Sequence, residues 1–426
     1  MFSFDRARAH ARLAKMPVLC AVLPLFLYAQ AASAQNLTLS DALARVASGD
    51  PVVAATAAQL QAANAAIAQA DVRPRDVIGV DVEDFAGTGP YSPIDRSQTT
   101  AWYERTWERG GKREARIGAA RSSVGVTSAR TRLRMLDLLA QVQAAWVEAL
   151  SAEAAVAVAG QRLAEAERVE TEVRRRVAAA LDPLFAAERA KTSVAQARIA
   201  LDQAQAAARI ARAYLAAWWG GTADYRLDTA PFTNLAAAPA AEGDLPDLAL
   251  LDAERAAADA RVRLAETGNA GDPTARVGVR HFGQGNDVAL VVGGSIPLGN
   301  RSANRGNVER ARADAQAAEA EIAVARVERR REIDRLTAER AALATEIVRL
   351  DREVLPGAER AVVMVRDGFR RGGTAFTFLE VSQASQAVIE LRSRRIDLLR
   401  RFHLIGARLD RLTGRHLPLI ASAENR

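Results

Sequence analysis

The stretch Leu163-Ala164-Glu165-Ala166-Glu167-Arg168 recurs 192 residues later as Leu355-Pro356-Gly357-Ala358-Glu359-Arg360. At the same offset, Arg113 corresponds to Arg305. Similarity that keeps its order along the chain indicates duplication of one structural unit. We therefore expect two repeats, and the fold follows from what one repeat contains.

The repeats set the expected domain boundaries. A signal segment at 1–34 precedes the first repeat at 35–221, which should hold a helix, a pair of strands and a long helical hairpin. A linker or equatorial segment at 222–244 leads to the second repeat at 245–414. A C-terminal tail is expected at 415–426.

The predicted helices are longer than a globular domain needs. At 1.5 Å per residue, the segments at 112–177 and 302–369 would each extend about 100 Å. Two shorter helices together approach that length, so each long helix can pair with two short ones stacked end to end. The shorter helices are predicted at 50–70, 184–219, 245–267 and 378–413.

The second long segment carries a coiled-coil pattern. Apolar residues there step by seven, four, three and four, which is the a/d spacing of a helical seam. Pro356-Gly357 lies near its far end and predicts a kink, because proline cannot donate the helical hydrogen bond. The seam residues are Leu336, Leu343, Ile347, Leu350 and Val354.

Each repeat also contains two strand candidates. In the segment 76–84, Ile78, Val80 and Val82 point one way and Gly79, Asp81 and Glu83 the other, so one face is apolar and one polar. The four predicted strands have the length of a tilted outer-membrane span. A small soluble antiparallel sheet would show the same sequence pattern and remains the alternative. They are predicted at 76–84, 99–107, 275–282 and 287–298.

The first 34 residues have the pattern of a secretory signal. Basic residues precede an apolar run, and Ala32-Ser33-Ala34 fits the small-residue cleavage rule. The one cysteine, Cys20, lies inside this segment, so the mature chain would hold no disulfide. No apolar run of about 18 residues follows, so an exported chain of this kind could span only an outer membrane, with strands.

Charge and histidine content argue against other classes of protein. The formal net charge is +7, and the arginines are spread along helices among glutamates, which disfavours nucleic-acid binding. The chain has four histidines and no phosphate-binding GxxxxGK[ST] motif, and Gly110-Gly111-Lys112 does not form one. We therefore expect no enzyme activity, no cofactor and no tightly bound transition metal.

Motifs in a fixed order make the chain resemble the TolC-type outer-membrane efflux protein family, on its heavy-metal branch. The resemblance covers essentially the whole mature chain, and the order and spacing of its motifs carry it. They are Leu37-Thr38-Leu39-Ser40-Asp41-Ala42-Leu43, Asp50-Pro51, Arg109-Gly110-Gly111-Lys112-Arg113, Ile296-Pro297-Leu298, Asn304-Arg305-Gly306, Gly372-Gly373-Thr374, Leu379-Glu380-Val381 and the closing segment 409–414.

The resemblance implies a mainly α fold with a small β part. Each chain would contribute two long helical hairpins to a periplasmic α-barrel and four strands to a twelve-stranded outer-membrane β-barrel shared by a homotrimer. The implied partners are outer-membrane lipid, a periplasmic adaptor of the membrane-fusion type and an inner-membrane pump of the resistance-nodulation-division type. The implied function is a passive exit duct of a tripartite efflux system, with divalent heavy-metal cations as the substrate of this branch.

The resemblance also assigns candidate site residues. The hairpin tips would dock the adaptor, and acidic side chains just past the second tip would constrict the channel. Glu380 matches the first such acidic position, Gln383 stands where a second would be, and Glu188 is the repeat counterpart of Glu380. The tip residues are Ala180, Leu181, Asp182, Arg370, Arg371, Gly372, Gly373 and Thr374, and the aromatic residues expected at the membrane interface are Trp102, Tyr103 and Trp107.

A periplasmic coiled-coil adaptor or scaffold is the alternative. It would also be exported and rich in long helices. An adaptor should hold one helical hairpin between β-rich halves, whereas this chain has two hairpins and two strand pairs. A soluble scaffold would not need strands with one apolar face.

Overall fold

The structure is a computed structural model that describes residues 36–91, 94–236, 245–298, 301–371 and 376–424. The predicted signal segment lies outside these residues. From Asn36 onward the chain forms one compact unit. Its helices and strands follow the predicted order closely.

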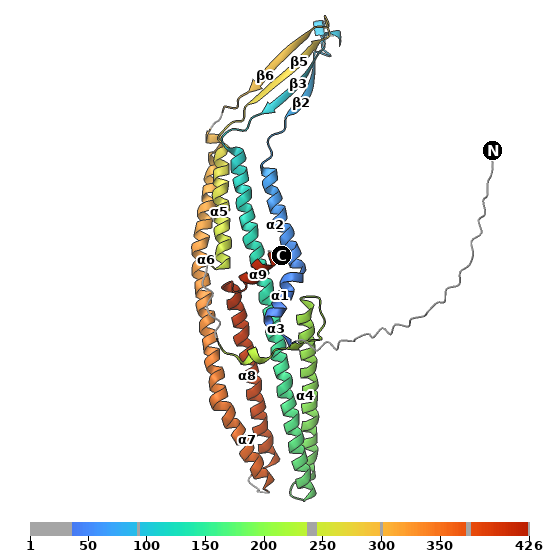
Figure 1. The fold of residues 1–426 in the computed structure, drawn as a ribbon, viewed down its shortest axis with the longest axis vertical. Helices are drawn as coiled ribbons and strands as arrows, with labels where there is room; N and C mark the ends of the chain where they lie inside the picture. The colour runs from blue at the N-terminus through green and yellow to red at the C-terminus, as the bar shows by residue number, and fades with distance from the viewer. Residues whose placement is uncertain (1–35, 92–93, 237–244, 299–300, 372–375, 425–426) are drawn as a thin grey trace, which may run out of the picture. The chain divides into compact units, whose positions relative to one another are not determined.

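The first hairpin consists of α3 (Lys112–Ala178) and α4 (Leu184–Ala217), which pack side by side (Figure 1). Gly110 and Gly111 precede α3 with φ of 72° and 74°, a left-handed conformation that glycine adopts without steric cost. Pro183 is the N-cap of α4. At 1.5 Å per residue, α3 extends about 100 Å, as the sequence predicts.

The second hairpin differs from the first by a π turn. The helix α6 (Arg301–Arg349) passes through the π turn Leu350–Val354 into α7 (Leu355–Arg370), and α8 (Phe378–Leu412) returns. Leu355 donates its N–H to the carbonyl of Leu350, five residues back. Where a kink was predicted at Pro356, the wider turn lets the helix continue past a residue that has no N–H.

Shorter helices extend both hairpins toward the sheet. They are α1 (Leu39–Gly49), α2 (Pro51–Ala70) and α5 (Pro246–Thr267); α2 packs on α3, and α5 packs between α3 and α6. Thr38 and Asp41 form a capping box that begins α1, and the Asp50 side chain caps α2. The sequence predicted α2 and α5 but neither α1 nor α9 (Leu417–Glu424), which lies in the expected C-terminal tail.

A four-stranded antiparallel sheet stands at the end of the helices where α2, α3, α5 and α6 meet it (Figure 1). Its order is β2-β3-β5-β6, so the strand pairs of the two repeats adjoin through β3 and β5. The strands are β2 (Val77–Glu83), β3 (Gln98–Thr106), β5 (Thr274–Phe282) and β6 (Val288–Ser295). A short parallel pair, β1 (Asn36–Leu37) with β4 (Arg226–Leu227), lies elsewhere.

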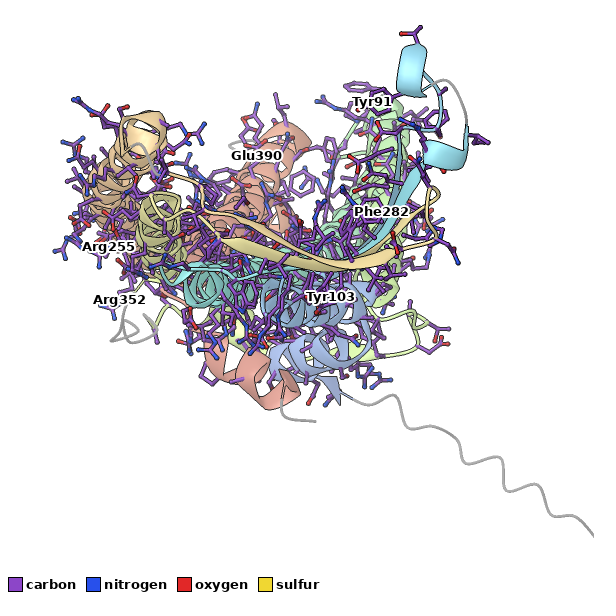
Figure 2. The ribbon with its side chains drawn as sticks, turned by 90° about the horizontal axis from the view of Figure 1, so that it is seen from above. Tyr91, Tyr103, Arg255, Phe282, Arg352 and Glu390 are labelled. Atoms are coloured by element: carbon purple, nitrogen blue, oxygen red, sulfur yellow. The ribbon has the colours of Figure 1, made fainter. Side chains whose placement is uncertain are left out.

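The sheet has one apolar face and one polar face, as predicted. Ile78, Val80, Leu290 and Val292 share the apolar face and are 81%, 62%, 72% and 74% exposed. Figure 2 looks along the molecule onto the sheet, with Tyr103 and Phe282 labelled on it. Nothing else in the described part of the chain covers this apolar face.

The main core is centred on the middle of α3. Leu139, Val142 and Trp146 are buried there against residues such as Ile347 and Phe402 of the second hairpin. By length and composition α3 also contains a stretch apolar enough to cross a membrane, although it includes some charged residues. Part of that stretch is buried against neighbouring helices.

His403 of α8 anchors the linker to the core. Its ring stacks on Phe232 with a centroid distance of 5.6 Å, and Nε2 donates a hydrogen bond of 2.8 Å to the Phe232 carbonyl. Burial lowers the pKa of His403 below its usual value, even though the carbonyl favours the protonated form. The folded chain therefore prefers the neutral ring.

This preference predicts a loss of stability in mild acid. The His403 ring takes up a proton near pH 6.5 in the unfolded chain, whereas the folded chain resists protonation of this ring. The neutral ring therefore contributes fully to folding stability above about pH 6.5, and this contribution falls as the pH decreases further. We expect the thermal midpoint to drop between about pH 7.5 and about pH 5.5, and His403→Gln to reduce the drop. His281→Gln, the same substitution on the exposed end of β5, is measured beside it as the control for the chemical change. An equal pH dependence in the wild type and His403→Gln would contradict the assignment.

Candidate functional site

The first hairpin tip is a tight turn after α3. Ala180 adopts a φ of 55°, and Leu181 donates its N–H to the carbonyl of Arg176 at 2.9 Å, which closes the helix end. Leu181, Leu184 and Phe185 are 59%, 81% and 68% exposed. The tip therefore presents apolar side chains to its surroundings.

Arg176 connects the two hairpin tips. Its buried guanidinium makes hydrogen bonds of 2.8 and 3.0 Å to the Asp182 carboxylate in the first tip, and one of 2.6 Å to the Phe369 carbonyl at the end of α7. It also lies 4.2 Å from the centre of the Phe369 ring. The ion pair with Asp182 raises the pKa of Arg176. Asp182, predicted as a docking residue, thus also holds the tips together.

The second tip is described only in part. Arg370 pairs with Asp367 one turn back in α7, and this hydrogen bond lowers the pKa of Asp367. Arg371 is exposed. The predicted docking residues Gly372, Gly373 and Thr374 lie outside the described residues.

Glu380 begins α8 as part of a capping box. Its carboxylate accepts a hydrogen bond of 2.8 Å from the N–H of Thr377, and the Thr377 hydroxyl accepts one of 3.2 Å from Leu379. The hydroxyl of Thr377 also donates to this carboxylate, which is the main reason that the pKa of Glu380 is lowered. Glu380 is therefore an exposed, ionised group at physiological pH.

The other gate candidates are exposed but separate. Gln383 lies one turn after Glu380 on α8, and Glu188 lies on the first turns of α4. The backbone carbonyl of Glu188 accepts a hydrogen bond of 2.9 Å from Thr192. Within one chain these residues do not form a single cluster.

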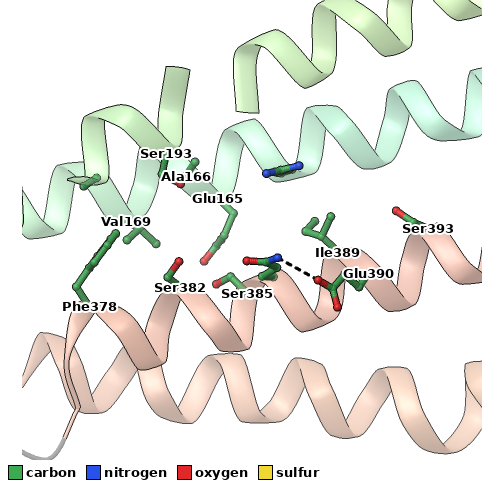
Figure 3. A pocket seen from close by; sticks show the side chains of 13 residues that line it. Glu165, Ala166, Val169, Ser193, Phe378, Ser382, Ser385, Ile389, Glu390 and Ser393 are labelled. Carbon is green, nitrogen blue, oxygen red and sulfur yellow. Dashed lines mark hydrogen bonds between the residues drawn. The ribbon is translucent and has the colours of Figure 1, made fainter. Parts of the chain in front are cut away.

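A cavity of about 360 Å³ lies between the two hairpins, above the tips (Figure 3). Glu165 reaches from α3 toward Ser382 and Ser385 of α8, and Gln386 donates a hydrogen bond of 3.0 Å to Glu390. Val169 and Ile389 add apolar surface. The sequence did not predict this cavity, because its walls come from helices about 200 residues apart.

The predicted interface aromatics do not share one environment. Tyr103 lies on the apolar face of the sheet, whereas Trp102 lies on the polar face beneath the guanidinium of Arg276, which is 3.8 Å from its ring. Adjacent residues of a strand point to opposite faces, so Trp102 does not belong to a lipid-facing girdle with Tyr103. Trp107 follows β3 and donates its N–H to the Pro273 carbonyl at 3.0 Å.

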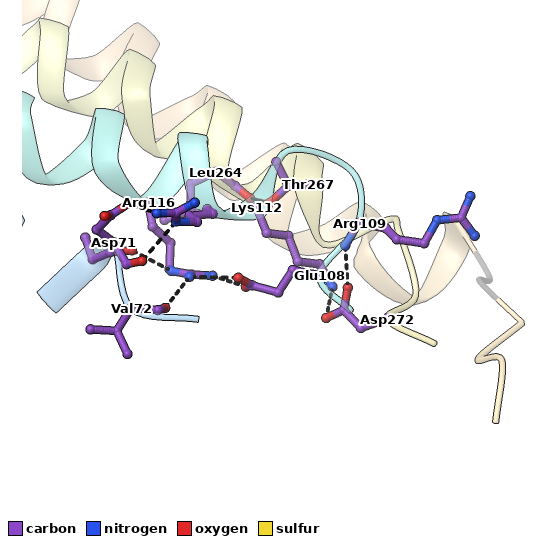
Figure 4. A network of polar contacts seen from close by, with 11 residues as sticks. Asp71, Val72, Glu108, Arg109, Lys112, Arg116, Leu264, Thr267 and Asp272 are labelled. Carbon is purple, nitrogen blue, oxygen red and sulfur yellow. Dashed lines mark hydrogen bonds and ion pairs between the residues drawn. The ribbon is translucent and has the colours of Figure 1, made fainter. Parts of the chain in front are cut away.

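A polar network fastens the sheet to the helices (Figure 4). Arg116 of α3 pairs with Glu108 after β3 and donates to the carbonyls of Ala70 and Val72 at the end of α2. Lys112 pairs with Asp272, before β5, at 2.7 Å. Hydrogen bonding by Arg116 lowers the pKa of Glu108, so this junction remains charged in mild acid.

No metal site accompanies these features. Across the described ranges, no group of three or more His, Cys, Asp and Glu side chains is placed to hold a metal ion.

The Arg176 contacts yield a prediction for the stability of the tips. Arg176→Met leaves Asp182 and the Phe369 carbonyl without their donor, which should cost about 2 kcal/mol of local stability. The measurement is hydrogen exchange of the tip amides, which should become faster. Arg175→Met is the matched control, since Arg175 is exposed and pairs with Glu172 one turn back. Similar exchange in the two variants would show that Arg176 does not hold the tips.

Comparison with known proteins gives relatives by sequence, although no family model matches. The chain is 29% identical over 396 residues to the cobalt-zinc-cadmium resistance protein CzcC of Cupriavidus metallidurans, covering 90% of this chain and 91% of the relative. It is 28% identical over 284 residues to the nickel and cobalt resistance protein CnrC of the same species, covering 65% and 67%.

Solved structures share the fold. The outer membrane protein VceC of Vibrio cholerae matches with a TM-score of 0.69 and 20% identity, over 88% of this chain and 96% of that one. CusC matches with a TM-score of 0.72 and 15% identity, over 89% and 92%. Sequence and fold together confirm the predicted resemblance and the predicted outer-membrane location. The chain thus resembles the TolC-type outer-membrane efflux proteins in fold, and its relatives by sequence are heavy-metal resistance proteins such as CzcC.

Proposed function

We propose that the chain is the outer-membrane channel subunit of a tripartite efflux system. In this proposal three copies form a passive exit duct for divalent heavy-metal cations. A periplasmic adaptor and an inner-membrane pump of the resistance-nodulation-division type deliver the cations. The duct itself catalyses no reaction.

The sheet is the observation that carries the proposal. It exposes a continuous apolar face, and its outer strands β2 and β6 each have one neighbour within the described chain. In lipid, unpaired strand edges are not tolerated, because no water satisfies their N–H and C=O groups. Four strands cannot close on themselves, so strands from further copies would complete a twelve-stranded barrel.

The hairpin tips support docking of an adaptor. They lie at the opposite end of the helices from the sheet, where an exit duct would meet its periplasmic partners (Figure 1). Leu181, Leu184 and Phe185 provide exposed apolar surface beside the charged Arg370 and Arg371. Apolar anchors rimmed by charge are typical of an interface between proteins.

The relatives support the choice of substrate. Their names describe resistance to cobalt, zinc, cadmium and nickel, all of which form divalent cations. Glu380, exposed and ionised near the second tip, would attract such cations if three copies bring it to a common axis. We place the gate there, with Gln383 one turn further along α8 and Glu188 on α4 as candidate supporting residues.

Two neighbouring residues of β6 allow a matched test of membrane insertion. Val292 lies on the apolar face and Val291 on the polar face. Val292→Arg should destabilise the inserted protein by about 2–4 kcal/mol and reduce the amount in the outer-membrane fraction, because a charge near the bilayer midplane is costly. Val291→Arg should insert nearly as well as the wild type. Native mass spectrometry of the extracted wild-type protein should give a trimer.

A soluble wild-type monomer would contradict the channel and favour a periplasmic adaptor or scaffold. Equal insertion of the two arginine variants would contradict the assignment of the lipid-facing side.

Glu380 can be tested without loss of its helix cap. Glu380→Gln keeps an acceptor at the third position of the helix, where glutamine also completes a capping box, but removes the charge. We expect the reconstituted trimer to lose cation selectivity, seen as a reversal potential closer to zero in a salt gradient.

Thr377→Ala is the complementary control. It removes the capping hydroxyl and costs about 1 kcal/mol, but it retains the carboxylate. This variant should keep its cation selectivity. If Glu380→Gln and the wild type had the same reversal potential, Glu380 would be a capping residue only.

A further inference from the structure

The polar face of the sheet carries a set of charges that the proposed function leaves unexplained. Three carboxylates, Asp81, Glu83 and Glu104, share this face with Arg276 and Arg280. Cross-strand register brings them together, because Arg276 lies opposite Glu104 and Arg280 opposite Thr100. All five side chains come from strands β2, β3 and β5.

Arg276 lies between two carboxylates from different strands. Its Nε donates to Glu104 at 3.2 Å, and its Nη1 lies 3.7 Å from the carboxylate of Asp81. The same guanidinium stacks on the ring of Trp102 at 3.8 Å. One arginine thus compensates two carboxylates while an aromatic ring fixes its plane.

Two glycines make room for this stack. A Cβ at Gly79 would lie 2.2 Å from the Trp102 ring, and a Cβ at Gly278 would lie 2.6 Å from the carbonyl oxygen of Ala101. The indole therefore lies flat across β2, where no side chain could remain. This close packing indicates that the position of Arg276 is built into the sheet.

Arg280, four residues after Arg276 on the same face of β5, also pairs with a carboxylate from β2. It pairs with Glu83 at 2.8 Å and donates hydrogen bonds of 2.9 and 3.0 Å to Thr100 and Gln98. Its side chain is 29% exposed, while that of Glu83 is 53% exposed. The guanidinium of Arg280, from β5, is held by partners on β2 and β3, and the Glu83 carboxylate is the more exposed member of the ion pair.

We propose that Arg276 and Arg280 determine how the channel treats divalent cations, by neutralising the carboxylates of the polar face so that a cation passes without being retained. This inference rests on the proposed function, in which the polar face lines the pore. Three carboxylates against two guanidinium groups leave a net charge of −1 per copy on this face. A weakly negative polar face attracts cations into the pore. Because the face is nearly neutral, it does not hold them there.

The charge of the polar face sets how long a cation stays in the pore. Conduction requires that a site bind an ion strongly enough to admit it and weakly enough to release it. Carboxylate oxygens are hard ligands, and several around one space hold a divalent cation tightly. Asp81 and Glu104 already flank the position of the Arg276 guanidinium, so removing its charge would leave two carboxylates facing an open space.

The test removes that charge. The Arg276→Gln trimer, extracted in detergent, is titrated calorimetrically with CdCl₂ and CoCl₂ beside the wild type. We expect the variant to bind these cations at least about tenfold more tightly, a change of about 1.4 kcal/mol. In planar bilayers, the same cations should block the variant at correspondingly lower concentration.

Three controls separate charge from packing. Arg276→Lys keeps the positive charge and should behave like the wild type. Glu104→Gln combined with Arg276→Gln restores the net charge of the face and should abolish the added binding. Arg255→Gln removes an exposed partner of Glu319 on the helices, away from the sheet, and should change neither readout.

The outcomes distinguish this inference from the proposed function. A wild-type protein that forms no conducting trimer would overturn both. A conducting wild type with unchanged cation binding and block in Arg276→Gln would overturn the inference alone. If Arg276→Gln fails to assemble, Arg280→Gln is measured in its place and must bind the cations more tightly than the wild type, because it uncovers the carboxylate of Glu83.

Discussion

The unpaired edges of the four-stranded sheet are the constraint on which the rest of the structure depends. A sheet with β2 and β6 at its outer sides and an exposed apolar face has no stable place in water as an isolated unit. Lipid can cover the face, and further strands can pair with the edges. In the proposed assembly of several copies, the two hairpins below the sheet would have to pack beside the hairpins of neighbouring copies.

The junction between sheet and helices shows how this constraint is transmitted. Arg116 ties the end of α2 to Glu108, and Lys112 ties the start of α3 to Asp272. These residues come from both repeats, so the strand pairs and the long helices are fixed relative to one another at one point. Stiff helices about 100 Å long then carry that geometry from the sheet to the tips. A small change in the angle at the junction would become a large displacement at Arg176 and Asp182.

Patterns with a short repeat could be read from the sequence, and contacts between distant residues could not. Alternation over 76–84 predicted the faces of β2, and the apolar steps from Leu336 to Leu350 predicted a seam that is buried in the structure. The last predicted seam residue, Val354, lies in the π turn and is 45% exposed, so the prediction was wrong there. The same alternation, applied to β3, would have placed Trp102 and Tyr103 on opposite faces. By contrast, nothing adjacent in sequence distinguishes buried Arg176 from exposed Arg175, because its partner Phe369 lies 193 residues away. The cap made by Thr377 was visible in principle as Thr-x-x-Glu, a motif that serves structure even where its glutamate also serves a gate.

Arginine has a different task at each level of this molecule. On the helix surfaces, pairs such as Arg330 with Asp334 are exposed and contribute at most about 1 kcal/mol each. Between helices, Arg395 holds the Asp351 carboxylate with both arms of its fork, at 2.6 and 3.0 Å, and so fixes the register of α8 against the π turn. At the tips and on the polar face, Arg176 and Arg276 each combine carboxylates with an aromatic ring, which places a charge at a defined position. A planar, permanently charged group suits all three tasks, whereas lysine would supply the charge without the two-armed or stacked geometry.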